Sequence, residues 1–418
     1  MKNHNRISIL GLLLLSMILL GACSAGPERS RKPSDDWARG LLIGEDAVST
    51  VAMTVDDDGE RIHALWAFSG EDGQGGLRYV QLARGTVAPL DREVLTLQGQ
   101  VSSPYLLQAD EGLFHVLWTN RTSTAEKWQL WYAQMDQDGQ LVEEPRVLSA
   151  PEAGVLNVVV AQDGEQGMLA IWEGAQGGGI MLTRVSPLGE KQTEIRLVAD
   201  AGHNPGLAVD EEERIHLSWL DPDNQLLYVQ VASLDEFPVQ SEPVYRFRFG
   251  TGASLEGPSV GVAGDDVYLF WSVLNQSGLE AGTAKTEYLV LQQEDVPRVV
   301  ERGELGILPL EEQPYQPEEG LYGYQVLVPA SYVNRTSAFV YEPSLVQNPT
   351  GEMAVAVAMQ QDYRLDAYIQ MAVAILEDGA YKGYALATKT QAISSDPILV
   401  ADGTGQLHLL WRDGFAKE

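Results

Sequence analysis

Positive charge and cysteine are both scarce in this chain of 418 residues. Lys and Arg total 28 against 59 Asp and Glu, which leaves a formal net charge of -31. A protein this acidic repels phosphate backbones, so nucleic acid is not expected as a partner. The single cysteine cannot close an intramolecular disulfide, and stability must therefore come from an apolar core. A hydrophobic fraction of 44% over this length is sufficient for one.

The sequence has no apolar run long enough to span a bilayer. The longest run covers residues 7–20, or about 21 Å as a helix against about 30 Å of hydrocarbon, and it follows Lys2 and Arg6. This pattern is typical of a secretory signal. The sequence Leu20-Gly21-Ala22-Cys23 resembles the lipobox of bacterial lipoproteins, which implies that residues 1–22 are a signal peptide and that Cys23 is the site of lipid attachment. An ordinary signal peptide is the alternative.

A small, polar stretch punctuated by proline follows the cysteine. Residues 23–37 are therefore expected to form a flexible tether, with the lipid as the only contact with a membrane. Ser24 stands where an Asp would imply retention at the inner membrane in the lipoprotein family. The expected location is the bacterial cell envelope, at the outer membrane or on an outward-facing cell surface.

The remainder of the chain is built on a repeat. Short alternating runs end at positions separated by 47 to 54 residues, except for one interval of 86, and at most copies a proline stands 13 or 14 residues before the end position. The end positions are Trp66, Trp118, Trp172, Trp219, Trp271, Val357 and Trp411. A period near 50 with four short strands per copy predicts an all-β fold, a β-propeller.

Seven copies predict seven four-stranded blades over residues 38–418, although a count of six blades remains open. The last copy has only two strands of its own, and residues 38–44 are expected to add an outer strand that closes the ring. The interval of 86 residues predicts an insertion at about 293–340.

The repeat resembles the BNR or sialidase-like family of bacterial propellers, in which Pro, Asp, Gly, His and Trp recur at similar spacing. The resemblance implies the architecture and little about chemistry, since the Asp-box pattern and the Arg-Ile-Pro sequence of true sialidases are missing here.

Several motifs favour structural interpretations. His63, His115, His216 and His408 stand three residues before a repeat Trp, so a propeller distributes them around a ring instead of gathering them at one metal. Aspartates in the recurring turns are explained by hairpin chemistry, with structural calcium as the alternative and no other cofactor expected. Gly257-Pro258-Ser259-Val260-Gly261 matches a nucleophile elbow, but it falls on a strand. No catalytic residue and no metal site are assigned.

The loops between second and third strands bring variable side chains to one rim, where a ligand is expected to bind. The candidate rim residues are Arg121, Trp128, Glu173, Asp221, Asn275, Tyr363 and Arg364. The sequence favours a surface-anchored, non-enzymatic propeller that binds a protein or a neutral glycan. The alternative is a carbohydrate-active hydrolase or lyase of sialidase-like fold.

Overall fold

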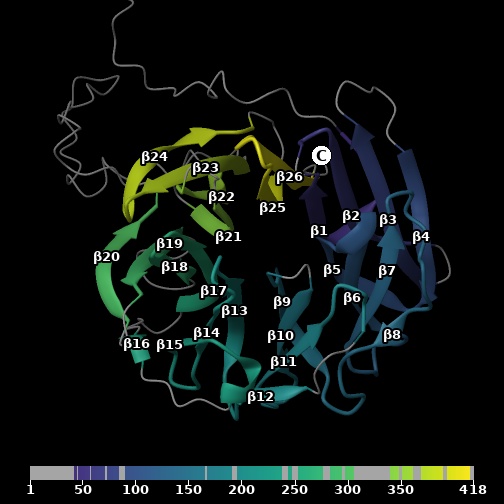
Figure 1. Cartoon of the computed structure of the whole chain (residues 1–418), viewed down its shortest axis with the longest axis horizontal. Helices are drawn as coiled ribbons and strands as arrows, with labels where there is room; N and C mark the ends of the chain where they lie inside the picture. Colours follow the sequence, from purple (N-terminus) through teal and green to yellow (C-terminus); the bar gives the residue numbers. More distant parts are fainter. Residues whose placement is uncertain are drawn as a thin grey trace, which may run out of the picture.

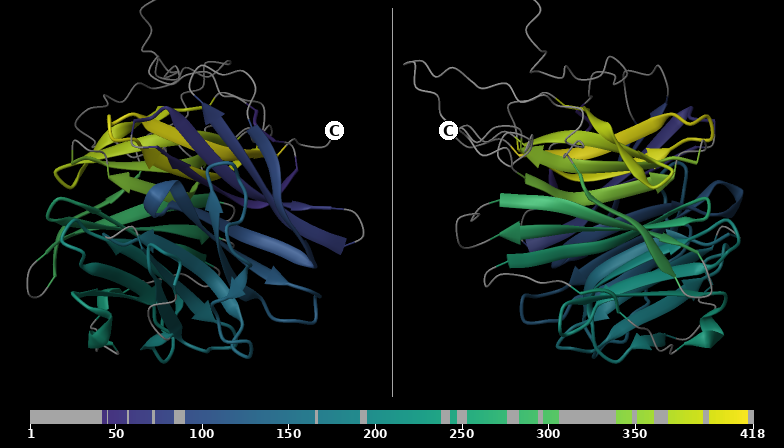
Figure 2. Two further views of the ribbon diagram at one scale, coloured as in Figure 1. Left: turned by 45° about the vertical axis from the view of Figure 1, so that its right-hand side comes forward. Right: turned by 90° about the vertical axis from the view of Figure 1, so that its left-hand side faces the viewer.

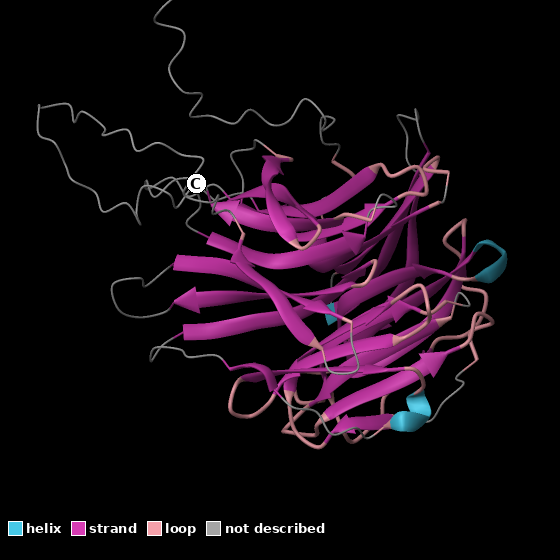
Figure 3. Ribbon diagram, turned by 60° about the vertical axis from the view of Figure 1, so that its left-hand side comes forward, coloured by secondary structure: helices cyan, strands magenta, loops and turns pink. Residues whose placement is uncertain are grey.

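The computed structural model is built almost entirely from antiparallel strands (Figure 3). It describes residues 42–414 apart from 45, 57, 71–72, 84–89, 165–166, 191–194, 238–242, 247–252, 276–282, 294–296, 306–338, 348–350, 361–368 and 389–392. In these segments, the helical elements are short 3₁₀ turns such as Asp110–Gly112 and Leu234–Glu236. No helix among the described residues is long and apolar enough to cross a membrane. Residues 1–41, including the predicted signal peptide, Cys23 and the whole predicted tether, lie outside the description.

The strands follow one another in six groups of four and a final group of two, each group forming one blade. Blades 1 to 3 contain β1 (Ala47–Val55), β2 (Arg61–Ser69), β3 (Gln74–Ala83), β4 (Leu90–Gln98), β5 (Gln100–Gln108), β6 (Leu113–Arg121), β7 (Gln129–Asp136), β8 (Arg146–Val147), β9 (Val155–Gln162), β10 (Met168–Gly174), β11 (Ile180–Val185) and β12 (Arg196–Ala199).

Blades 4 to 7 continue the same order. They contain β13 (His203–Val209), β14 (Ile215–Leu220), β15 (Gln225–Val231), β16 (Pro243–Arg246), β17 (Ala253–Ala263), β18 (Asp266–Asn275), β19 (Thr283–Gln292), β20 (Arg298–Glu304), β21 (Phe339–Gln347), β22 (Met353–Gln360), β23 (Ile369–Glu377), β24 (Ala380–Leu386), β25 (Ile393–Ala401) and β26 (Leu407–Gly414).

The blades form a closed ring. The first strand of each blade lies innermost and contacts the first strands of both neighbours, including β25 against β1 (Figure 1). The described residues form seven hydrophobic clusters, and each of them joins two adjacent blades. Seven junctions require seven blades, so the predicted seven-bladed propeller is confirmed and the count of six is excluded.

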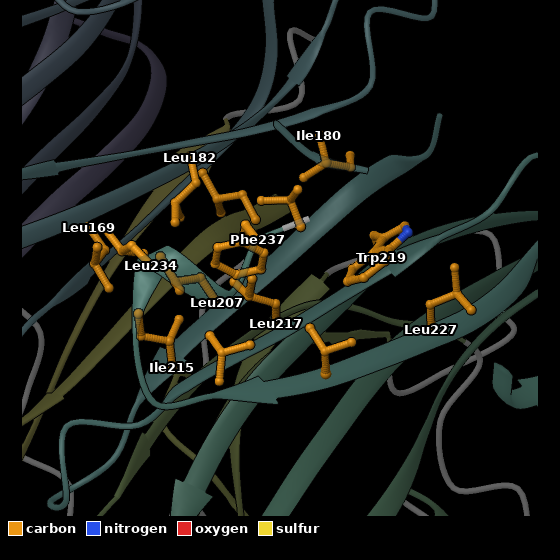
Figure 4. Packing of buried hydrophobic residues seen from close by; sticks show 14 residues of the cluster. Leu169, Ile180, Leu182, Leu207, Ile215, Leu217, Trp219, Leu227, Leu234 and Phe237 are labelled. Carbon is orange, nitrogen blue, oxygen red and sulfur yellow. The ribbon is translucent and has the colours of Figure 1, made fainter. Parts of the chain in front are cut away.

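The repeat Trp positions supply the largest side chains of these clusters. Trp118, Trp172, Trp219 and Trp271 lie in the second strands and are at most 2% exposed. Their strands alternate with period two, so one face of a blade packs on each neighbour. Figure 4 shows the cluster between blades 3 and 4, where Trp219 packs beside Ile180 and Leu227. Alanine at such a position would cost about 3–5 kcal/mol.

Blade 7 has two described strands, β25 and β26. A single parallel bridge between Ile369 and Ile393 links it to blade 6. Of the predicted closing strand, residues 42–44 are described and have no strand assignment, but Ile43 packs into the cluster shared by blades 1 and 7. The views of Figure 2 place β25 and β26 beside β1. Within the predicted insertion, residues 298–304 form β20, and 306–338 lie outside the description.

Candidate active site on the bulged ends of the inner strands

Every inner strand carries a β-bulge near its start. The pairing with the second strand shifts at one equivalent place in all seven blades: between Ala47 and Val51, Ser102 and Tyr105, Leu156 and Val159, His203 and Gly206, Glu256 and Ser259, Tyr341 and Ser344, and Ser395 and Ile398. Bulges of this kind re-aim side chains and are common next to active sites. The seven shifts therefore form a ring of irregular backbone around the propeller axis.

Five of these bulges contain a residue with positive φ, and four of these residues are polar. Ser103, Asn157, Asn204 and Asp396 have φ values of 48°, 44°, 51° and 53°, and Gly257 has 90°. Non-glycine residues with positive φ are uncommon and cluster at functional sites. A proline directly follows four of these residues, and in the sequence these prolines served only to align the copies of the repeat. The signal that was missed is the Ser, Asn, Gly or Asp directly before each of the four prolines.

Glu173 is held by the bulges of blades 3 and 4. Its Oε2 accepts a hydrogen bond from Nδ2 of Asn157 at 2.8 Å and from the backbone N–H of Asn204 at 3.3 Å. The Asn157 amide also donates to Oδ1 of Asn204 at 2.8 Å. No ion pair of Glu173 with a described cation is present. A partly exposed carboxylate among neutral amides is suited both to accept sugar hydroxyls and to transfer a proton.

Arg121 and Trp128 come together at the edge of blade 2. The guanidinium carbon lies 4.5 Å from the indole centroid, while Nε and one Nη donate to Oε1 of Gln100 at 2.8 and 2.5 Å. The backbone carbonyl of Trp128 accepts from the N–H of Val155 at 3.0 Å, so this loop abuts blade 3. Val155 pairs with Gly174, directly beside Glu173. Three of the seven candidate rim residues thus lie along one junction.

The remaining four candidate rim residues are Asp221, Asn275, Tyr363 and Arg364. Asp221 serves its own turn, because Oδ1 accepts from the N–H groups of Asp223 and Gln225 at 2.9 and 2.8 Å. Asn275 is at the end of β18, where its backbone pairs with Ala253, and nothing is described of its side chain. Tyr363 and Arg364 lie outside the described residues.

An ion pair belongs to the ring in blade 7. Nη2 of Arg412 lies 2.6 Å from Oδ2 of Asp396, and the Ser395 hydroxyl donates to the same oxygen at 3.0 Å. Arg412 and Glu173 occupy the same place in their repeats, one residue after Trp411 and Trp172. The position after the repeat Trp is therefore where the blades differ in charge.

Three of the repeat histidines, His63, His115 and His216, are fully buried inside the blades and His408 is partly buried, in line with their interpretation as structural imidazoles. His216 is fully buried, with Nδ1 2.8 Å from the Tyr228 hydroxyl and Nε2 2.9 Å from Asp210. Burial lowers the pKa of His216 more than the hydrogen bond to Asp210 raises it. His63 repeats the arrangement with Tyr79 and Asp56. A neutral imidazole satisfies both partners in blade 4, so this triad ties strands together.

Aspartates of the acidic turns use their carboxylates on the turns themselves. Oδ1 of Asp136 accepts from the N–H groups of Asp138 and Gln140, and Oδ1 of Asp402 accepts from those of Thr404 and Gln406. Among the described residues, no group of three or more His, Cys, Asp or Glu could hold a metal ion. Ser259 lies within β17, in a strand context that does not suit a nucleophile elbow.

No family model and no curated protein match the chain. Among solved structures, the polysaccharide lyase Uly1 is similar at a TM-score of 0.56 and 9% identity, over 94% of this chain and 91% of that one. A PL25 ulvan lyase gives 0.45, with 10% identity over 73% and 76%. The GH43_1 enzyme from Xanthomonas citri gives 0.38, with 14% identity over 63% and 93%.

The likeness to Uly1 extends over almost the whole chain and supports the propeller fold. It also corrects the expected function. The prediction of a non-enzymatic binding propeller is contradicted, because a solved structure that matches along almost the full length is an enzyme. That prediction rested on long-range charge repulsion and on the absence of known catalytic motifs. Neither of these gives information about the bulges or about the residues that lie on them.

Proposed function

We propose that this protein is a carbohydrate-active enzyme that cleaves glycosidic bonds at the bulge ring, in the sector formed by blades 2 to 4. The observation that carries the proposal is Glu173, held by Asn157 and Asn204 at two left-handed bulges. The backbone strain of such positions is maintained only where the surrounding structure enforces it, and it is typical of functional sites.

Glu173 is the proposed proton-transferring group. Its carboxylate is partly exposed and already aligned by two N–H donors, while Asn157 and Asn204 offer further amide groups to sugar hydroxyls. A positioned general acid or base contributes about 10²–10⁴ in rate. Both hydrolysis and β-elimination require such a group, and the two reactions leave different products.

The surroundings of the enzyme are also part of the proposal. Lipid attachment at Cys23 would anchor the propeller to the bacterial cell envelope, at the outer membrane or an outward-facing surface. The BNR-like repeat would then present the bulge ring to envelope or extracellular glycan. The net charge of -31 opposes the long-range approach of an anionic polymer, and the neutral glycan that it predicted stays a prediction. A protein ligand stays a prediction.

The test is cleavage of a panel of neutral and uronate polysaccharides by the full chain. New reducing ends report any cleavage, whereas ultraviolet absorbance of a conjugated double bond reports elimination alone. We expect Glu173→Gln to reduce the rate at least a hundredfold. Glu190→Gln is the matched control, because Glu190 is exposed on the turn between β11 and β12 of the same blade. Cleavage by Glu173→Gln at the wild-type rate would overturn the assignment, and no cleavage of any glycan would overturn the function.

A further inference from the structure

We infer that Arg121, stacked on Trp128 and braced by Gln100, is a binding subsite for the acidic group of a sugar. This inference rests on the proposed function and narrows its substrate to a glycan that carries carboxylate or sulfate groups. It concerns binding, so it can be tested separately from cleavage.

The guanidinium of Arg121 is fixed in orientation on two sides. Gln100 Oε1 accepts from Nε and from one terminal nitrogen, and the indole ring of Trp128 lies 4.5 Å below the guanidinium carbon. Gln100 is itself held, since its backbone carbonyl accepts from Nδ2 of Asn120 at 3.1 Å. These contacts leave the remaining terminal nitrogen of Arg121 without a described partner. A planar, pre-oriented guanidinium edge is suited to carboxylate or sulfate oxygens.

Arg121 also differs from most arginines of this acidic chain. Arg184, Arg214 and Arg412 each lie 2.6 Å from an aspartate oxygen. Arg121 makes no ion pair with any described carboxylate, and its polar partner is the neutral amide of Gln100. A chain with 59 acidic residues thus keeps one aromatic-stacked cation available beside the proposed site.

The acidity of the whole protein does not oppose this contact. Exposed charges are screened beyond about 8 Å at physiological ionic strength, so the net charge slows the approach of an anionic polymer more than it weakens a direct ion pair. The subsite is also adjacent to the proposed catalytic carboxylate. Trp128 bonds to Val155, and Val155 pairs with the residue that follows Glu173. An acidic sugar on Arg121 would therefore lie along the same glycan as the bond that is cleaved.

The experiment measures binding by the full chain with five probes. They are polygalacturonate, alginate, the carboxyl-reduced form of each, and dextran sulfate. We expect an acidic polymer to bind about ten- to a hundredfold more tightly than its uncharged counterpart, as a charge-assisted hydrogen bond predicts. Arg121→Gln should abolish this preference, and Arg121→Lys should retain part of it.

Arg298→Gln is the matched control. It removes the same charge from an exposed arginine that also bonds to a glutamine, with Nη2 3.2 Å from Oε1 of Gln292 in blade 5. Unchanged thermal melting of Arg121→Gln would verify the fold. If a preference for polyuronate is lost only in the Arg121 variants, the group bound by Arg121 is a carboxylate. If a preference for dextran sulfate is lost only in these variants, the group is a sulfate.

Equal binding by the Arg121→Gln and Arg298→Gln variants would overturn the inference, as would wild-type protein that shows no preference for any acidic probe. Cleavage of neutral polymers without an acidic preference would remove the inference and leave the proposed function. Acidic binding without any cleavage would do the reverse.

Discussion

Asn157 donates its side-chain amide to the side-chain oxygen Oδ1 of Asn204 across the junction of two blades, at 2.8 Å, and both residues have a left-handed backbone. The same unusual conformation thus recurs in neighbouring strands, and the Asn157 side chain and the Asn204 backbone N–H both donate to Glu173. This relationship connects the repeat architecture to the proposed site. Every blade has a bulge at this place, but the chemistry of each bulge depends on the residue that lies on it.

The backbone of Asn157 gives the first prediction. At φ 44°, a Cβ costs about 1–2 kcal/mol that glycine does not incur, so Asn157→Gly should be more stable than Asn157→Ala. Thermal or denaturant unfolding of the two variants measures the difference. Gln162, exposed at the end of the same strand, is the control, since there alanine should be more stable than glycine by about 0.5–1 kcal/mol. The same order at both sites would contradict the prediction.

The buried triad of His216 predicts the response of stability to acid. Burial lowers the pKa of His216 in the folded state, so the unfolded chain binds the proton first as pH falls. Stability is therefore lost progressively below about pH 6.5, the ordinary pKa of the imidazole.

Asp210 adds a second loss at lower pH. Burial alone would raise its pKa, but hydrogen bonds from His216 and Arg214 outweigh burial and lower it. The stabilisation that Asp210 provides is present above about pH 3.9 and disappears as the pH falls through the pKa of Asp210 in the folded state.

The His216→Gln variant tests the contribution of the imidazole. Its melting temperature should fall less steeply than that of the wild type between about pH 8 and pH 5, because glutamine cannot titrate in that range. Parallel curves for variant and wild type would refute the assignment.

Asp46 stabilises the junction of blades 1 and 7. Its Oδ1 accepts from the Trp66 indole N–H at 2.8 Å, and its Oδ2 lies 2.9 Å from Nη1 of Arg78. Asp46→Ala leaves a buried indole donor unpaired, which should cost about 1–3 kcal/mol of unfolding free energy. Asp91→Ala tests the arginine alone: Asp91 is 55% exposed and 3.8 Å from Arg78, and its loss should have little measurable effect. Equal losses would show that the indole bond contributes nothing.

Tyr79 ties blade 1 to blade 2. Its hydroxyl donates to the backbone carbonyl of Gln137 at 2.9 Å and lies 2.6 Å from Nδ1 of His63. Burial raises the pKa of Tyr79, so the hydroxyl stays protonated and available as a donor over the whole neutral range. Tyr79→Phe should lower the unfolding free energy by about 1–3 kcal/mol, measured by denaturant unfolding. An unchanged midpoint would mean that solvent replaces both bonds.

The fold was predictable because its signals are local. Each repeat Trp lies in a second strand, and the alternation around Trp118 or Trp219 alone indicates a strand with a buried face. The proline spacing fixed the register between copies. Blade count followed from these positions, since seven equivalent strands need seven sheets.

The site was less predictable, for a physical reason. A bulge shifts pairing by one residue and leaves no mark on hydrophobic periodicity, so the roles of Asn157 and Asn204 were not visible. Arg121 and Trp128 were identified as rim residues, but their contact depends on how one loop folds back. The carboxylate of Asp221 could either bind a ligand or accept hydrogen bonds within its own turn, and only the structure shows that it serves the turn.

The seven clusters, each shared by two adjacent blades, leave the molecule without one central core. A circular permutant whose new ends lie between blades, for example between β8 (Arg146–Val147) and β9 (Val155–Gln162), would retain all seven junctions if the original ends were joined. The same closed ring of blades would therefore form whichever blade comes first in the chain.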